Sequence, residues 1–176
     1  MDALKAIRTR RSIRQFTDKP ITIRQITTIL EAARWAPSGL NNQPWRFVVI
    51  QDQSRKEALA KCTRYSSIVQ KAPLLICVLL DRNATYNRLK DLQAIGACIQ
   101  NMLLAAHAIK LGACWLGEIL HKRRSVERIL HVHKKLELMA VLAIGYPKKK
   151  KQKRSRLPLK KIVLPVFFII LFIGGF

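Results

Sequence analysis

The stretch APSGLNNQPWRFVVI, residues 36–50, joins a tight polar turn directly to a segment that looks like a buried strand. The turn contains two prolines, a glycine, two asparagines and a glutamine, and by composition alone it fits a plain turn with buried amides. The following run, 45–51, is rich in aromatic and β-branched residues and short enough to be a buried strand. So many amide side chains directly before a strand are unusual, and the rest of the sequence is read for their role.

Hydrophobic periodicity divides the rest of the chain into helices and extended segments. An apolar stripe of Ile26, Ile29, Leu30 and Ala33 predicts an amphipathic helix that ends before Pro37. Helices are predicted at 2–9, 22–36, 54–62, 90–112 and 124–130, and extended segments at 45–51, 73–81, 114–118 and 137–147. This order lacks regular strand–helix–strand alternation, so it favours an α+β fold.

The composition predicts one folded domain with a strong positive charge. The chain has 176 residues, of which 49% are hydrophobic, and a net charge of +23. Nine bases lie between Lys148 and Lys161, whereas all ten acids precede Pro147. The part before Pro147 is therefore itself basic, and the protein will attract phosphates, nucleic acid or anionic lipid.

Cysteine and histidine usage gives little sign of a metal or redox site. Cys62, Cys77, Cys98 and Cys114 lie far apart in apolar patterns, as expected for buried reduced thiols in a cytoplasmic protein. The N-terminus has no apolar signal region. The HVH run at 131–133 could place two imidazoles on one strand face, but solvated loop histidines are the favoured interpretation.

An arginine-rich segment is the clearest candidate for ligand chemistry, because neither a dinucleotide-binding glycine fingerprint nor a P-loop occurs. The segment RTRRSIR places Arg8, Arg10, Arg11 and Arg14 around Ser12 where the first predicted helix ends. Guanidinium groups match phosphate oxygens in a bidentate manner, and a hydroxyl adds a neutral donor. The segment by itself fits a phosphate site and a solvated basic surface equally well.

Several motifs in order resemble the nitroreductase family of FMN-dependent oxidoreductases. They are RRSIRQF, PSGLNNQPWRFVVI, DLQAIGACIQNMLLAAHAIKLGACWLG, AIGYP and RSRLPL, which together span about residues 3–161. The resemblance implies a nitroreductase-like α+β fold with a central, mostly antiparallel sheet flanked by helices, in an intertwined homodimer. The long apolar segment 90–112 resembles the helix of that dimer. The domain would cover residues 1–161.

The resemblance also implies a set of FMN-binding residues. Asn41 and Gln43 would bond the polar edge of the isoalloxazine and the ribityl chain, with Pro37 holding the backbone, while Ser38 and Gly39 approach the cofactor of the partner subunit. The phosphate and ribityl contacts would be made by Arg10, Arg11, Ser12 and Arg14, with Arg154 and Arg156 closing on the same phosphate. The backbone at Trp115, Leu116 and Gly117 would face the flavin ring.

By the same resemblance, FMN would carry the electron chemistry and no catalytic side chain is expected. NADH or NADPH would deliver a hydride, and a small-molecule acceptor such as a nitroaromatic or quinone would then use the same site in ping-pong turnover. The segment between Lys61 and Asp91 is short, so the site is predicted to be open and tolerant of varied acceptors. A shared site also explains why no dinucleotide fingerprint is needed.

The chain end departs from the family pattern. Residues 162–176, IVLPVFFIILFIGGF, are uncharged and follow a lysine cluster. A membrane-spanning helix needs about 20 apolar residues, and Pro165 interrupts this run early. Three interpretations stay open: an apolar arm on the partner subunit, which is favoured, a membrane-touching anchor led by the basic run, and an altered reading frame.

Three other functions compete with a nitroreductase-like enzyme. A flavin-dependent dehydrogenase or dehalogenase would use the same fold but needs lid residues that this chain lacks. A basic nucleic-acid-binding protein would explain the net charge of +23, but it leaves the amide-rich turn unexplained and has no recognition motif. A flavin-binding protein without turnover would use the same residues as the enzyme.

Overall fold

The computed structural model describes residues 1–148 and 155–164. In chain order its helices and strands are α1 (Ala3–Thr9), α2 (Ile23–Arg34), β1 (Trp45–Ile50), α3 (Gln53–Ala60), α4 (Ser66–Lys71), β2 (Leu74–Asp81), α5 (Arg88–Ala108), β3 (Gly112–Leu116), α6 (Arg123–Ile129) and β4 (Leu136–Gly145). Short 3-10 turns cover Gly39–Asn41, Glu118–Lys122 and Leu159–Lys161. The predicted α+β fold is confirmed.

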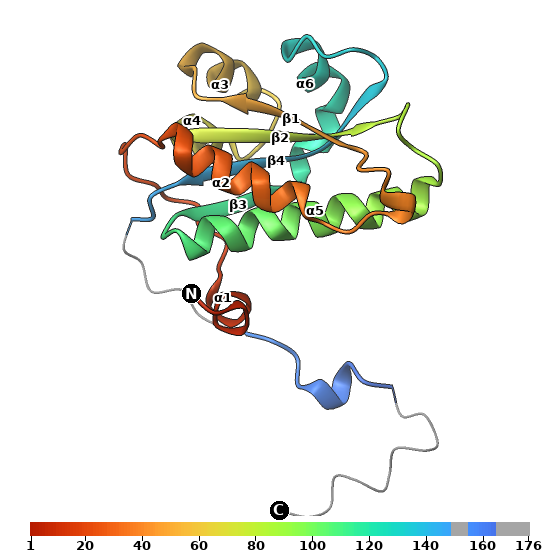
Figure 1. The fold of residues 1–176 in the computed structure, drawn as a ribbon. Helices are drawn as coiled ribbons and strands as arrows, with labels where there is room; N and C mark the ends of the chain where they lie inside the picture. The colour runs from red at the N-terminus through yellow and green to blue at the C-terminus, as the bar shows by residue number, and fades with distance from the viewer. Residues whose placement is uncertain (149–154, 165–176) are drawn as a thin grey trace, which may run out of the picture.

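A four-stranded sheet in the order β1-β2-β4-β3 forms the centre of the molecule, and every pairing in it is antiparallel. Helices α2 and α5 cover one face, while α3 and α6 lie across the other (Figure 1). Strands β2 and β4 are buried on both faces, which explains why their sequences are apolar without alternation. The sheet thus separates two apolar layers.

Alternate side chains of β2 enter the two layers. Ile76 and Val78 pack with α2 and α5, whereas Leu75 and Cys77 pack on the side of α3, α4 and α6. All four cysteines are buried and unpaired, as predicted. Burial raises the pKa of Cys77 to about 12, so its thiol is inert at neutral pH.

Helix α2 forms where the apolar stripe predicted it. Thr22 caps its N-terminus in a capping box with Gln25, and Ile26, Ile29 and Ala33 are buried while Leu30 is partly buried. The helix ends at Arg34, shortly before Pro37. Its position fixes the start of the amide-rich turn.

Helix α5 is the longest element of the described residues and runs along one face of the sheet (Figure 1). Asn87 caps its N-terminus by accepting a hydrogen bond from the backbone N–H of Lys90. One face of the helix is buried in this chain, but Leu89 is 70% exposed and Leu92 is 37% exposed near its N-terminus. The helix therefore retains apolar surface that its own chain does not cover.

Two features differ from the sequence expectations. The predicted helix at 54–62 is followed by a second one, α4, whose six residues are too few to give a clear period. The extended segment predicted at 114–118 begins two residues earlier and gives way to a 3-10 turn at Glu118. Within residues 1–148 and 155–164, no helix has the length and apolar character needed to cross a membrane, and 165–176 of the apolar end lie outside the described residues.

Candidate functional site

The arginine-rich segment leaves α1 and runs beside the edge strand β3. The backbone N–H of Ile13 donates to the carbonyl of Ala113 at 3.0 Å, and Ser12 forms a parallel bridge with Ala113. A Cβ on Gly112 would lie 2.6–2.8 Å from atoms of Ile13, so glycine is needed for this close approach. The segment is thereby held in place through its backbone.

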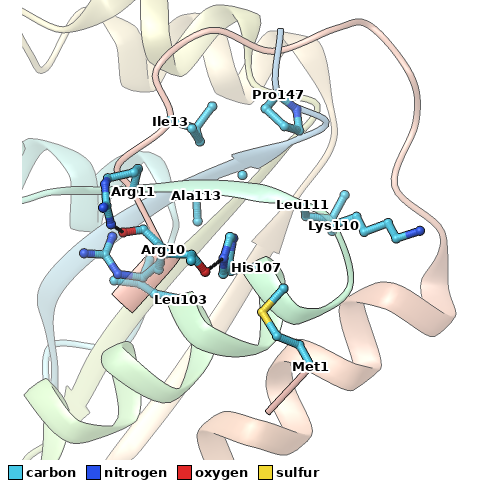
Figure 2. Close-up of a pocket in the computed structure, with 12 residues that line it drawn as sticks. Met1, Arg10, Arg11, Ile13, Leu103, His107, Lys110, Leu111, Ala113 and Pro147 are labelled. Atoms are coloured by element: carbon cyan, nitrogen blue, oxygen red, sulfur yellow. Dashed lines mark hydrogen bonds between the residues drawn. The ribbon is translucent and has the colours of Figure 1, made fainter. Parts of the chain in front are cut away.

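A pocket of about 350 Å³ opens beside Arg10 and Arg11 (Figure 2). His107, from the last turn of α5, lies in its wall, and its Nε2 is 2.7 Å from the hydroxyl of Thr9. Burial lowers the pKa of His107, and the positive charges of Arg10 and Arg11 lower it further. The pocket therefore has a positive potential, and His107 and Thr9 belong to it although sequence reasoning did not select them.

Other predicted phosphate contacts lie around the same segment. Arg11 donates hydrogen bonds to the carbonyls of Arg8 and Arg10, and a second pocket, of about 420 Å³, brings Arg11 together with Arg156. Arg14 is exposed, and its charge, with that of Arg10, opposes the burial that raises the pKa of Cys114. The structure thus gathers Arg10, Arg11, Ser12, Arg14 and Arg156 near one edge of the sheet, whereas Arg154 lies outside the described residues.

The amide-rich turn at 37–44 has an unusual backbone. Leu40, Asn41 and Gln43 all have positive φ values, of 54°, 54° and 46°, in the left-handed region that residues other than glycine seldom adopt. The N–H of Gln43 donates to the hydroxyl of Ser38 at 3.0 Å, closing the turn. Such strain persists only where surrounding contacts impose it.

Asn42 supplies those contacts. Its side-chain amide donates to the carboxylate of Asp91 at 2.7 Å and to the carbonyl of Ala84 at 2.8 Å. Asp91 is fully buried in the first turn of α5 and also accepts hydrogen bonds from the backbone N–H groups of Tyr86 and Asn87. Neither Asn42 nor Asp91 was among the predicted site residues. The available signal was an acid, Asp91, at the start of a long apolar segment.

The two predicted flavin-contacting amides remain exposed. Among the described residues, no hydrogen bond is formed by the side chain of Asn41, and that of Gln43 donates only to the carbonyl of Asn41, at 3.2 Å. Pro37 is exposed and Ser38 and Gly39 are partly exposed on the same turn. The turn therefore presents exposed amide donors and acceptors, on a backbone that Asn42 anchors to the buried Asp91.

The segment 115–117 ends β3 and has a mixed exposure. Leu116 is buried and Trp115 is 44% exposed, while Gly117 is exposed with nothing within 4 Å of the place that a Cβ would occupy. The following Glu118 is held by the hydroxyl of Thr63 and by Arg64. The backbone near Gly117 and part of the Trp115 side chain are accessible to a ligand, whereas the Leu116 side chain is not.

The predicted site residues form two groups that are separated within one chain. The turn contacts the N-terminal end of α5 through Asp91, and the arginine segment contacts its C-terminal end through His107. These two anchors are sixteen positions apart along the helix, which is about 24 Å at 1.5 Å per residue. A single chain does not bring the two groups to one small ligand.

Comparison with known proteins gives the same family along most of the chain. The model of the Nitroreductase family matches residues 7–64 and 53–146. A Desulfovibrio desulfuricans protein solved in complex with FMN is 49% identical, with a TM-score of 0.89 over 94% of this chain and 96% of that chain. The NADPH:FMN oxidoreductase of Vibrio harveyi, solved with NAD+, is 27% identical, with a TM-score of 0.85 over 92% of this chain and 76% of that one.

A curated relative, the NADH dehydrogenase of Thermus thermophilus, is 30% identical and aligns with 93% of this chain and 96% of its own length. The family match covers both the arginine segment and the amide-rich turn, whose geometry is described above. The chain is therefore a member of the nitroreductase family.

Proposed function

We propose that this chain is the subunit of an FMN-dependent oxidoreductase that takes a hydride from NADH or NADPH and passes two electrons to a small-molecule acceptor. Membership of the nitroreductase family gives the class, an NAD(P)H-dependent flavin oxidoreductase. The observation that carries the assignment of the site is the pair of exposed amides, Asn41 and Gln43, on a turn held by a buried carboxylate. Nitroaromatics and quinones are the acceptors that we propose, because the short segment after α3 forms no extended cover.

The residues near β3 fit the phosphate end of FMN. Guanidinium groups of Arg10, Arg11, Arg14 and Arg156 supply charge-assisted donors, and Ser12 adds a hydroxyl. Burial lowers the pKa of His107 first, and the charges of Arg10 and Arg11 add to this effect; a phosphate dianion would neutralise those charges. In this proposal Arg154, from the same RSR motif as Arg156, joins them.

The turn fits the polar edge of the isoalloxazine. A flat heterocycle with alternating N–H and C=O groups needs both donors and acceptors, and each primary amide side chain supplies both. Asn41 and Gln43 would make these bonds, with Pro37, Ser38 and Gly39 against the ring and the backbone of Leu116 and Gly117 facing it. The rigid turn orients the amides before the ligand arrives, which lowers the entropy cost of binding.

We propose a homodimer in which each FMN site uses both subunits. The two groups of site residues lie at opposite ends of α5, about 24 Å apart, so two α5 helices packed antiparallel about a two-fold axis would place the turn of one subunit near the arginines of the other. Exposed apolar residues are available for this packing on three helices, namely Leu4, Ile7, Trp35, Leu89 and Leu92.

A bound FMN would supply the redox chemistry, namely hydride acceptance from the donor and two-electron transfer to the acceptor. The chain's own residues would bind and orient the cofactor, and positive groups would favour the charge of its reduced form. Among the described residues, no group of three metal-ligating side chains converges. We further propose that donor and acceptor occupy one open site in turn, which is ping-pong kinetics.

An anaerobic absorption experiment tests this function. The purified protein, supplied with FMN if necessary, is expected to be yellow, to bleach on addition of NADH or NADPH, and to recover its colour with a nitroaromatic or a quinone. Parallel lines in double-reciprocal plots at several acceptor concentrations would support ping-pong turnover. Protein that binds no FMN would refute the proposal, and protein that binds FMN but does not bleach would be a flavin-binding protein without turnover.

A further inference from the structure

A second basic site lies outside the group of residues assigned to FMN. It is a surface depression of about 910 Å³ formed by the end of β2, by α6 and by the loop that leads into β4. Six basic or titratable side chains line it: Arg82, Arg123, Arg124, Arg128, His131 and Lys134. Glu127 is the acid in its wall, so the depression carries a large surplus of positive charge.

A buried carboxylate beneath the depression fixes two of these arginines. Glu137, at the start of β4, is 2% exposed and pairs with Arg82 at 3.2 Å, with Arg88 at 2.9 Å and with Arg123. The pKa of Glu137 is lowered, first by its hydrogen bond with Arg88 and then by the other two arginines, against the effect of burial. One negative charge thus organises three guanidinium groups, which leaves a net positive charge around it.

The other bases of the depression have no carboxylate to balance them. Within the part of the chain that the structure describes, no acid pairs with Arg124, Arg128 or Lys134, and Arg128 donates only to the hydroxyl of Ser125, at 3.3 Å. Two unpaired guanidinium groups on one short helix, next to a lysine, offer several charge-assisted donors in one place. This is the chemistry that binds a phosphate or a pyrophosphate.

The depression lies at the same end of the sheet as the amide-rich turn. The N–H of Asp81, the last residue of β2, donates to the carbonyl of Pro44 at 2.7 Å, and its carboxylate pairs with Arg46 at 2.8 Å. The next residue, Arg82, lines the depression. The arginine segment that we assign to the FMN phosphate is bridged instead to Ala113, near the opposite end of the sheet.

We propose that this depression binds the phosphate groups of the dinucleotide that delivers the hydride. The inference rests on the proposed function, because it places the donor's nicotinamide at a flavin that lies against the turn. The pyrophosphate and, in NADPH, the additional phosphate extend from the nicotinamide end of the donor towards Arg124 and Arg128. The site supplies affinity for the donor by charge, which explains how the chain recognises a dinucleotide without a glycine-rich fingerprint.

The first test measures the anion site directly in the FMN-loaded protein, whose other phosphate site is filled. Inorganic pyrophosphate is titrated by calorimetry into the wild type, into the double variant Arg124→Gln with Arg128→Gln, and into a control with the same charge loss, Arg24→Gln with Arg55→Gln. Both control arginines are exposed and lie on α2 and α3. We expect the dissociation constant to rise on the order of tenfold in the first variant alone, and equal binding by all three proteins would overturn the proposal.

The second test asks whether the donor uses the site. The KM for NADPH is expected to rise about tenfold in the Arg124→Gln, Arg128→Gln protein, with a smaller rise for NADH, because each lost charge weakens attraction to phosphate. A synthetic dihydronicotinamide without phosphate should reduce all three proteins equally. An unchanged KM for NADPH, combined with loss of binding to a short DNA duplex, would overturn the proposal and make the depression a nucleic-acid surface. Failure of both donors to reduce the flavin would refute the proposed function. The pyrophosphate titration would still test whether the depression binds phosphate groups.

Discussion

The two halves of the proposed flavin site are built in different ways. The amide-rich turn is fixed by side chains: Asn42 reaches the buried Asp91, and three residues of the turn accept positive φ values as a result. The arginine segment is fixed by its backbone, through the bridge of Ser12 to Ala113, and Arg10 and Arg11 line a pocket beside it. We infer that the amide-rich turn has its shape before any ligand binds. The arginine segment instead supplies charge, and its side chains take their final arrangement from the ligand.

If this comparison is right, removing the anchor of the turn should have the largest effect on stability. Asp91→Ala removes a fully buried carboxylate and leaves the part-buried donors of Asn42, Tyr86 and Asn87 without it as an acceptor. We expect a loss of about 3–5 kcal/mol in the free energy of unfolding, measured by urea denaturation. The control is Asp52→Ala, which removes an exposed helix cap and should cost about 1 kcal/mol. Equal losses for the two variants would contradict the account of the turn.

Changing the arginines should give the opposite pattern, with strong effects on the ligand and little on the fold. For Arg10→Gln with Arg14→Gln we expect the dissociation constant of FMN to rise at least about 100-fold, since each charge-assisted hydrogen bond contributes about 1.5–3 kcal/mol and two are lost. Thermal unfolding of the apoprotein should move by less than about 2 °C. The measurement is quenching of flavin fluorescence, with Arg55→Gln as the control, and an FMN affinity equal to that of the control would remove these arginines from the site.

A smaller effect on stability is expected at Gly39, where the turn contacts the exposed ring of Tyr86. A Cβ on Gly39 would lie 1.9 Å from the hydroxyl oxygen of Tyr86, but that ring is 41% exposed and can swing away. Gly39→Ala should therefore reduce the free energy of unfolding by only about 1 kcal/mol. In a Tyr86→Ala protein, adding Gly39→Ala should not lower the free energy of unfolding further. A further loss would mean that the turn backbone itself requires glycine at position 39.

The smallest predicted effect is a change in one titration. Because the pKa of His107 is lowered by burial and by Arg10 and Arg11, the folded protein binds fewer protons than the unfolded chain below pH about 6.5. Stability should therefore be unaffected by this group above that pH and should fall as the pH drops from there through the folded pKa. FMN phosphate near Arg10 should raise the pKa of His107 again, which NMR of the imidazole protons can follow; an unchanged pKa on FMN binding would place the phosphate elsewhere.

Helices and strands could be predicted from the sequence where one face of the element, or all of it, is buried. The stripe at Ile26, Ile29 and Ala33 and the continuous apolar run of β2 each matched an observed element. The sequence could not predict α4, whose six residues are set by packing against α3. For the site, the amides could be selected from the motif, but the role of Asn42 could not, because a buried asparagine and an exposed one look alike in a polar turn. The separation of the two halves along α5 required the fold.

In the proposed dimer, one FMN site combines the arginine segment of one subunit with the turn of the other. The most direct test mixes two variants that each lose FMN: Arg10→Gln with Arg14→Gln, and Asn41→Ala with Gln43→Ala. After joint refolding, random pairing of subunits should restore about a quarter of the sites, because each mixed dimer has one intact site. We predict that the mixture regains yellow colour that bleaches with NADPH. No recovery, in a mixture shown by mass spectrometry to contain mixed dimers, would contradict the claim and place each site within a single chain.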